Sequence, residues 1–228
     1  MPIKIGIVGN YGTGKSSSIL PIGDHKGLPP ENTLIINSLG KDLPIKGFNK
    51  MYNKEKKNIV FPKDVSSLTN HIYDVYSKME NVKYVVIDDF IYLTTKHLID
   101  KAEEHSFTKY NATAGKIGGL MNALNSFGDD VFVFVMFHQE LDEHGLRVRS
   151  ASKMIDKLMN LEGLFTYLLF SDTTVDHEGK VAYTFITNAT TNSQGVVVPA
   201  KSPLGCFDDI RIPNDLGYVV DKVNEYRS

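Results

Sequence analysis

The sequence predicts an α/β fold in which a mainly parallel sheet is flanked by helices on both faces. Three observations lead to this fold class. Short runs rich in Ile and Val recur along the chain, for example at residues 3–8, 84–87 and 131–137. Segments with helical spacing of apolar residues separate these runs, and a glycine-rich turn follows the first run directly. Such alternation is typical of parallel sheets that are covered on both sides.

The composition narrows the class of protein further. The chain has 228 residues, which suits a single domain over 1–228 that includes the carboxyl-terminal strands and helix of 164–228. Its formal net charge is −2, so a nucleic acid would have to be bound by local patches. The single Cys206 excludes internal disulfides and cysteine-based zinc sites. No apolar run is long enough to span a bilayer, and a strand begins at residue 3, so we expect a cytoplasmic protein with no signal peptide and no membrane partner.

The first half of the chain is expected to hold three strands and their connections. Residues 3–8 form a buried strand, and 16–20 open a helix. Residues 33–37 form the second strand after a loop rich in Pro and Gly. Apolar residues recur at helical spacing over 66–79, which predicts a helix before the third strand at 84–87.

The second half continues the alternation. The periodicity predicts helices at 90–104, 117–127, 151–161 and 215–227. It predicts strands at 131–137, 164–170 and 181–187. Polar segments at 105–116 and 143–149 interrupt these elements and are expected to be loops.

The most informative motif follows the first strand and reads Gly9-Asn10-Tyr11-Gly12-Thr13-Gly14-Lys15-Ser16. It fits the phosphate-binding loop template, in which glycines let backbone N–H groups turn toward a phosphate at a helix N-terminus. Lys15 would reach the β- and γ-phosphates, and the Ser16 hydroxyl would coordinate Mg²⁺. The motif therefore predicts a site for ATP and Mg²⁺ over residues 9–17, including Ser17. The alternative is a glycine-rich turn that binds no ligand.

Two acidic residues end the third strand. Asp88 is expected to lie beside Ser16 and to hold Mg²⁺ with it. Asp89 has two alternative roles: it could orient or deprotonate the attacking water, or it could cap the helix that begins near residue 90.

The strand at 131–137 delivers His138 and Gln139 at its end. Either side chain could contact the γ-phosphate and report its loss, or His138 could be an ordinary histidine at a strand end. The polar segment that follows carries Arg147, Arg149 and Lys153, which either contact a ligand or form a solvated surface.

This order of phosphate loop, acidic strand end, broken helix pair and polar strand end resembles the RecA-like ATPase core. More narrowly, the chain is similar to small phage-type ATP-binding proteins grouped with the RecA-like single-strand annealing proteins. Those proteins carry a terminal "iPNDL" segment, and this sequence has Ile212-Pro213-Asn214-Asp215-Leu216. The resemblance implies a P-loop NTPase with a RecA-like core that hydrolyses ATP at the interfaces of a homo-oligomeric ring or filament. It also implies action on single-stranded DNA, in recombination, repair or annealing, in a host cytoplasm.

The resemblance also implies roles for particular segments. Residues 105–116, with Lys109 and Lys116, match the first DNA-binding loop of RecA-like proteins, and 140–152 match the second. Arg147, Arg149 and Lys153 are therefore the other residues expected to bind DNA. Lys201 matches the Lys of a Lys-x-Arg-x-Gly finger that acts on a neighbour's site, but Pro203 replaces the Arg. The usual catalytic Glu after the second strand is also missing, because residues 36–38 contain no acid.

Two other functions remain open. A P-loop kinase for a small metabolite would use Arg147 and Arg149 as lid arginines. A nucleotide-binding switch with little turnover is consistent with the missing Glu. The sequence lacks the Asn-Lys-x-Asp motif of GTPases.

Overall fold

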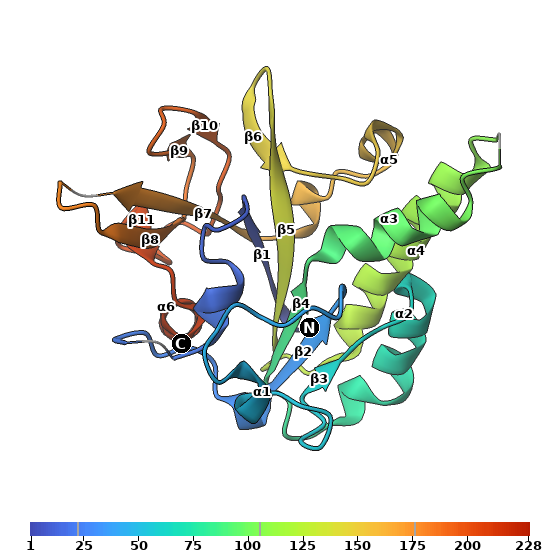
Figure 1. Cartoon of the computed structure of the whole chain (residues 1–228), viewed down its shortest axis with the longest axis horizontal. Helices are drawn as coiled ribbons and strands as arrows, with labels where there is room; N and C mark the ends of the chain where they lie inside the picture. The colour runs from blue at the N-terminus through green and yellow to red at the C-terminus, as the bar shows by residue number, and fades with distance from the viewer. Residues whose placement is uncertain (22, 105, 176) are drawn as a thin grey trace.

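The computed structural model describes residues 1–21, 23–104, 106–175 and 177–228. Its centre is a nine-stranded sheet, counted over these residues, with the order β11-β8-β7-β1-β5-β4-β2-β3 and with β6 paired to β5 (Figure 1). The strands are β1 (Ile3–Gly9), β2 (Thr33–Asn37), β3 (Ile59–Val60), β4 (Tyr84–Asp88), β5 (Phe132–Asp142), β6 (Gly145–Val148), β7 (Tyr167–Val175), β8 (Val181–Ile186) and β11 (Arg211–Pro213). A separate pair consists of β9 (Thr190–Thr191) and β10 (Val197–Val198).

Most of the sheet is parallel. The strands β7, β1, β5, β4, β2 and β3 all run in one direction, and β8 joins β7 in the antiparallel sense. The most apolar strand, β5, lies between β1 and β4, so it separates the strand before the phosphate loop from the strand that ends in Asp88. The predicted α/β class with a mainly parallel sheet is confirmed.

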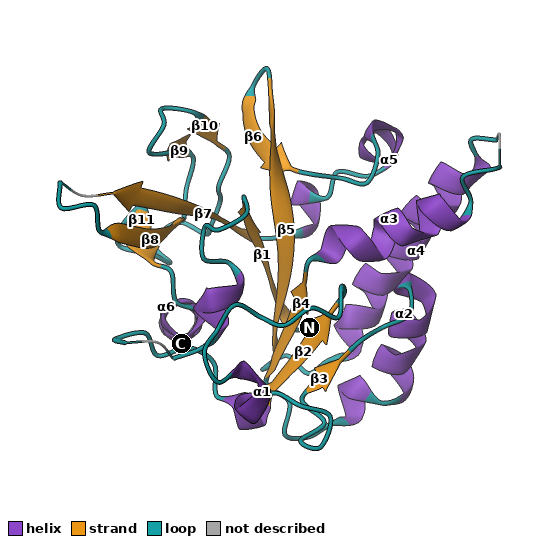
Figure 2. Ribbon diagram, viewed as in Figure 1, coloured by secondary structure: helices purple, strands orange, loops and turns teal. Residues whose placement is uncertain are grey.

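Helices cover both faces of this sheet, as Figure 2 shows. Alternate residues of β5 point to opposite sides, as the two-residue period of a strand requires. Val133, Val135 and Phe137 belong to one core, and Phe132 and Phe134 belong to the other. The first core packs against α2 (Val65–Asp74), α3 (Phe90–Asp100), α4 (Thr108–Ala123) and α5 (Lys153–Leu158). The second packs against α6 (Leu216–Arg227) and the single turn α1 (Phe48–Met51).

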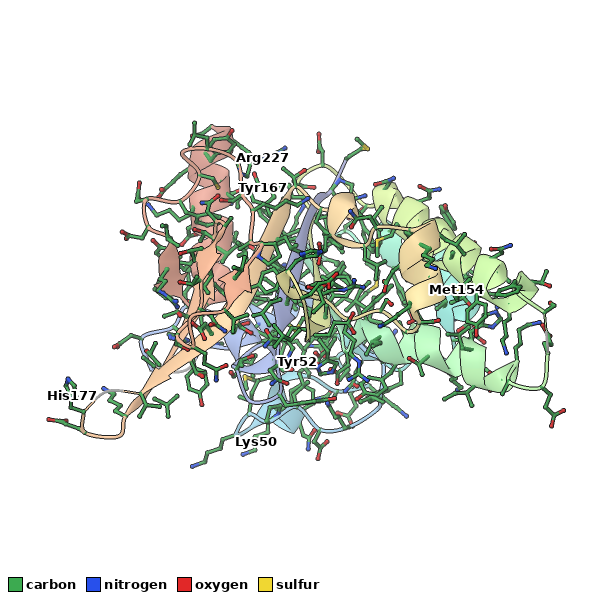
Figure 3. The ribbon with its side chains drawn as sticks, turned by 90° about the horizontal axis from the view of Figure 1, so that it is seen from above. Lys50, Tyr52, Met154, Tyr167, His177 and Arg227 are labelled. Carbon is green, nitrogen blue, oxygen red and sulfur yellow. The ribbon has the colours of Figure 1, made fainter. Side chains whose placement is uncertain are left out.

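Side chains fill both sides of the sheet in the view from above (Figure 3). Tyr52, which follows α1, is fully buried in the second core. Lys50, only two residues earlier, points away from the body into solvent. The turn that carries His177 projects beyond the sheet at the end of β7 and β8.

The prediction that residues 16–20 open an α-helix is wrong. The structure has a single 3-10 turn, Ser16–Ile19, and Leu20 is already extended, with φ −107° and ψ 151°. Pro21 explains this, because a proline disfavours the helical conformation of the residue before it. The phosphate loop therefore leads into one short turn rather than a long helix.

The polar break expected at 105–116 is also wrong over most of its length. His105 lies outside the described residues, and α4 begins at Thr108. Thr113 and Ala114 are buried on this helix, so tertiary packing outweighs its Asn, Thr and Gly content. The helix predicted at 117–127 is the second part of α4 and the turn after it.

The polar segment at 143–149 is a hairpin rather than an open loop. Strand β5 continues to Asp142 and pairs with β6, from Gln139 opposite Val148 to Asp142 opposite Gly145. This hairpin extends above the rest of the sheet in Figure 1.

The helices of the structure also bear on membrane association. Among the described residues, no helix is both long and apolar enough to cross a bilayer.

Candidate functional site

Most of the residues predicted to bind the nucleotide come together where β1, β4 and β5 end. Parallel pairing sets Gly9 opposite His138 and Asn37 opposite Asp88, so the ends of four strands lie at one edge of the sheet. A cavity of about 590 Å³ opens there. Its lining is Asn10, Tyr11, Gly12, Gly14, Lys15, Ser16, Ser17, His25, Lys41, Asp42, Pro44, Asp89, His138, Tyr183 and Asn214.

The loop needs two of its glycines for conformational reasons. Gly12 and Gly14 have φ of +73° and +89°, in the left-handed region that side chains rarely adopt. A Cβ atom on Gly14 would also lie 2.8 Å from Oδ1 of Asn214 and 3.0 Å from the ring of Tyr183. The carboxyl-terminal part of the chain therefore forms one wall of the phosphate loop.

Not all of the predicted loop residues face the cavity. Gly9 ends β1 and does not line it. Thr13 turns to the other side of the loop, where its hydroxyl lies 2.6 Å from that of Ser171 and donates to the Asn10 carbonyl. The other residues predicted for nucleotide contact do line the cavity.

Lys15 folds back over its own loop. Its Nζ donates to the carbonyls of Gly9 (2.9 Å) and Asn10 (2.7 Å), and only 7% of the residue is exposed. Burial lowers the pKa of Lys15 to about 8, although Asp89 and Asp88 act in the opposite direction. The ammonium group lies at the floor of the cavity, where an anion would stabilise its charged form.

Ser16 and Asp88 meet as the sequence predicts. The Ser16 hydroxyl donates to Oδ2 of Asp88 at 3.1 Å, and Asp88 is almost completely buried. Burial and the nearby charge of Asp89 raise the pKa of Asp88 to about 6. A hydroxyl and a carboxylate at this distance can share one divalent cation.

Asp89 does not cap α3. Its backbone is left-handed, with φ 55° and ψ 45°, and its side chain accepts no capping hydrogen bond. Instead, Oδ2 lies 2.5 Å from Lys41 Nζ, and Oδ1 lies 3.1 Å from His138 Nε2. Burial alone would raise the pKa of Asp89, but the contacts with His138 and Lys41 lower it to about 2. Asp89 is therefore an ionised group that links two neighbours at the cavity.

His138 and Gln139 face different cavities. His138 lines the phosphate-loop cavity, with its ring centroid 4.6 Å from that of Tyr11. Gln139 lines a second polar cavity of about 190 Å³, and Thr13 and Ser171 also line this cavity. Asn10 and Tyr11 line both cavities and form the wall between them.

Several buried polar atoms beside the loop lack a hydrogen-bond partner among the described residues. Apart from Asp89 Oδ2 and His138 Nε2, which lie in the ion pairs described above, they include Nδ1 of His138, Oε1 of Gln139 and Nδ2 of Asn214. An unpaired buried polar atom costs about 1–3 kcal/mol, so such atoms are uncommon and need an explanation. A polar ligand fits these surroundings better than an apolar one.

Several residues of the cavity lining were not predicted from the sequence, and they come from separate parts of the chain. Lys41 follows β2, and Tyr183 and Asn214 come from β8 and from the end of β11. Asn214 belongs to the "iPNDL" segment, which was a signal without a stated role. The neighbouring Asp215 caps α6 by accepting from Gly217 N at 2.8 Å and also accepts from the backbone N–H groups of Lys26 and Gly27.

The residues predicted to bind DNA do not form one patch of free cations. Arg147 forms ion pairs with Glu140 (2.8 Å), Asp142 (3.6 Å) and Asp156. Arg149 and Lys153 are exposed beyond the β5–β6 hairpin. On α4, Lys116 contacts His97 at 3.2 Å, and Lys109 lies over the ring of Tyr110. The DNA-binding roles stay predictions.

Lys201 lies away from the cavity. Its backbone pairs with Leu168, near the start of β7, and its side chain is not part of the cavity lining. Pro203, two residues later, lies beside Met1 and Lys4, at the opposite edge of the sheet from the phosphate loop. Lys201 therefore does not act on the site of its own chain.

Comparisons with known proteins add no family to this geometry. Neither a scan of protein-family models nor a search of curated proteins gave a match. Within the described ranges, no group of three or more His, Cys, Asp or Glu side chains is arranged to hold a metal ion.

Proposed function

We propose that this protein binds ATP with Mg²⁺ at the phosphate loop and hydrolyses it slowly. The observation that carries the proposal is the position of Lys15 and Ser16 at one cavity, with the Asp88 carboxylate 3.1 Å behind the Ser16 hydroxyl. These are the three groups that a phosphate loop needs for a nucleotide and its metal. The unpaired polar atoms beside the loop agree with a polar ligand.

The residues present fit Mg²⁺ even without a cluster of acidic ligands. Mg²⁺ bound to a nucleotide usually takes one or two protein ligands and completes its shell with phosphate oxygens and water. Ser16 and Asp88 would hold it, and the ion would neutralise charge that develops on the phosphates. Lys15 would leave the carbonyls of Gly9 and Asn10 and bind the β- and γ-phosphates.

Slow turnover is expected from the groups near the reacting phosphate. A general base works best when its pKa is near the operating pH, and the pKa of Asp89 is about 2. His138 adjoins Asp89 and can orient a water molecule, but no carboxylate follows β2 directly. The lack of a suitable general base also supports the alternative function, a nucleotide-binding switch with little turnover at the same site.

We further propose a RecA-like P-loop NTPase fold and action on single-stranded DNA. In support, β5 lies between β1 and β4 and brings His138 to the same edge as the phosphate loop. Because Lys201 lies away from the cavity of its own chain, the finger role that its segment resembles requires a homo-oligomer.

The kinase alternative is favoured by one observation, the second polar cavity that meets the first at Asn10 and Tyr11. An acceptor hydroxyl in that cavity would lie next to the phosphate loop. Stimulation of ATP turnover by nucleosides or sugars rather than by single-stranded DNA would select this alternative.

The test is calorimetric titration with ATP and Mg²⁺. Lys15→Ala should weaken ATP binding about tenfold to hundredfold, because it removes a charge-assisted contact with the phosphates. The matched control is Lys50→Ala, whose side chain points into solvent (Figure 3). Binding by Lys15→Ala at the affinity of the unmodified protein would overturn the site, and no binding by the unmodified protein would overturn the function.

A further inference from the structure

The carboxyl end of β2 presents a lysine to the phosphate-loop cavity. Buried Asn37 organises the turn after β2: its Oδ1 accepts from Gly40 N at 2.9 Å, and its Nδ2 donates to the Lys41 carbonyl at 2.7 Å. The neighbouring Ser38 hydroxyl donates to the Asp88 carbonyl at 2.6 Å. The backbone of Lys41 is thereby fixed relative to β4 and its two carboxylates.

The side chain of Lys41 is less constrained than its backbone, because it is only partly buried. Its Nζ pairs with Asp89 at 2.5 Å, but about half of the side chain is exposed and it lines the cavity. A lysine carries its charge on a flexible four-carbon chain, so the ammonium group can change partners while the turn stays in place. Lys41 lines the same cavity as Lys15 and Ser16, where the phosphates are expected to bind.

Asp89 does not depend on Lys41 alone. Its second oxygen lies 3.1 Å from His138 Nε2, and both side chains are nearly buried. If Lys41 leaves, Asp89 keeps a polar partner and is not left as an isolated buried charge, which would be costly. An exchange of partners by Lys41 is therefore energetically accessible.

Among the described residues, Lys41 is the one lysine or arginine that lines the cavity together with Lys15. Arg147 is held by three carboxylates on the β5–β6 hairpin and α5, and Lys201 lies away from the cavity.

We propose that Lys41 is a second phosphate-contacting residue, which exchanges the Asp89 carboxylate for the terminal phosphate of bound ATP. This inference rests on the proposed function. A triphosphate carries several negative charges and attracts an ammonium group more strongly than one carboxylate does. In hydrolysis, a water oxygen bonds to the γ-phosphorus while the bond to the β,γ-bridging oxygen breaks. The electron pair of the broken bond stays on the oxygen of ADP, and the water proton passes to the released phosphate. Lys41 stabilises the charge on the transferred group, as a finger residue supplied by the same chain does.

The experiment compares a nucleotide that has a terminal phosphate with one that lacks it. Calorimetric titrations use Mg²⁺ with AMP-PNP, which is not hydrolysed, and Mg²⁺ with ADP. Lys41→Met should weaken AMP-PNP binding about tenfold to hundredfold and change ADP binding by no more than about twofold, because one charge-assisted contact is lost. Lys41→Arg, which keeps the charge, should retain most of the preference for AMP-PNP. The matched control is Lys46→Met, an exposed lysine of the same segment that does not line the cavity.

A second comparison separates direct contact from an effect through Asp89. The effect of Lys41→Met on AMP-PNP binding is measured again in an Asp89→Asn background. Direct contact predicts an equal or larger loss there, because Lys41 no longer has to leave a carboxylate. If Lys41 only positions Asp89, the loss disappears in this background and the proposal is wrong.

The remaining outcomes are also decisive. An unchanged ratio of AMP-PNP to ADP affinity in Lys41→Met overturns the inference and leaves the proposed function intact. Failure of the unmodified protein to bind either nucleotide overturns both. Circular dichroism melting of each variant confirms that the compared proteins are folded.

Discussion

The Ser16 hydroxyl lies 3.1 Å from the Asp88 carboxylate, although 72 positions separate the two residues in the chain. Strand β5 separates β1, which precedes the loop of Ser16, from β4, which ends at Asp88, so side chains rather than paired backbones make the contact. A serine and a buried carboxylate positioned in this way are the two ligands that the proposed function assigns to Mg²⁺.

The first prediction concerns this pair. Ser16→Ala and Asp88→Asn should each weaken the apparent affinity for Mg²⁺ at fixed ATP about tenfold or more, because each removes a metal contact or its supporting group. Titration of Mg²⁺ against ATP turnover or nucleotide fluorescence measures this effect. Asp100→Asn, an exposed carboxylate at the end of α3, is the control. Equal Mg²⁺ dependence in Asp88→Asn and the control would show that another carboxylate serves the metal.

The pH dependence of nucleotide binding should have two limbs. Because the pKa of Asp88 is raised to about 6, this group is protonated at low pH, and Mg²⁺–ATP affinity should rise as pH increases through about 6. Because the pKa of Lys15 is lowered to about 8, affinity should fall as pH rises above about 8 and the ammonium group loses its proton. The phosphates of ATP also titrate near pH 6. The contribution of Asp88 is therefore the part of the rise in affinity near pH 6 that is lost in Asp88→Asn. If affinity rises equally with pH in Asp88→Asn and in the unmodified protein, Asp88 does not bind the metal.

The raised pKa of Asp88 should also make the free energy of unfolding depend on pH. A carboxyl group with a raised pKa binds its proton more tightly in the folded protein. Asp88 therefore favours the folded state below its ordinary pKa, and this contribution is lost as pH rises through about 6. Urea denaturation at pH 5 and pH 7 should show a smaller difference for Asp88→Asn than for the unmodified protein.

Gly14→Ala and Gly12→Ala should differ in their effect on the site. Both place a Cβ on a left-handed backbone, which costs about 1–2 kcal/mol. Only the Cβ on Gly14 would meet neighbours, Asn214 at 2.8 Å and Tyr183 at 3.0 Å. Gly14→Ala should therefore lose more nucleotide affinity and more thermal stability than Gly12→Ala. Equal affinities in the two variants would show that the wall formed by Asn214 does not shape the loop.

Asp215 should contribute more to the free energy of unfolding than the nearby Asp221 does. Asp215→Ala removes the cap of α6 and the acceptor for two backbone N–H groups at Lys26 and Gly27, so we expect a loss of about 2–3 kcal/mol in urea denaturation. Asp221→Ala breaks an exposed ion pair with the Lys26 side chain and should cost less than about 1 kcal/mol. Similar losses in the two variants would contradict the role assigned to the "iPNDL" segment.

The two arginines of the β5–β6 region should separate DNA binding from stability. Arg149→Ala should weaken binding of single-stranded DNA, with a smaller salt dependence, because this exposed side chain is available to phosphates. Arg147→Ala should mainly lower the melting temperature, since it leaves three carboxylates without their shared partner. Fluorescence anisotropy with a labelled oligonucleotide, with and without AMP-PNP, measures the first effect. No DNA binding by the unmodified protein would remove this part of the proposed function.

The sequence allowed the glycine-rich turn, the strand before it and the Ser16–Asp88 contact to be predicted. Each depends on local rules: glycines with positive φ, an apolar run of strand length, and parallel strands whose ends share one edge. Helix α4 could not be predicted over its first residues, because its Asn, Thr and Gly content favours a loop until Thr113 and Ala114 are buried. Lys41 was missed for a similar reason. Its place in the site follows from hydrogen bonds of Asn37 within an irregular turn, and no spacing rule describes them.

The position of β1 in the sheet has a consequence for how the protein is made. This strand pairs with β5 and β7, and more than half of the chain lies between β1 and the nearer of them. During synthesis the phosphate loop leaves the ribosome long before either neighbour exists, and the apolar strand beside it has nothing to pair with. Folding must wait for these distant segments, because contacts between remote parts of a chain form slowly. Fragments ending before β5 therefore expose an unpaired apolar strand, the kind of segment on which chaperones act and from which aggregation starts.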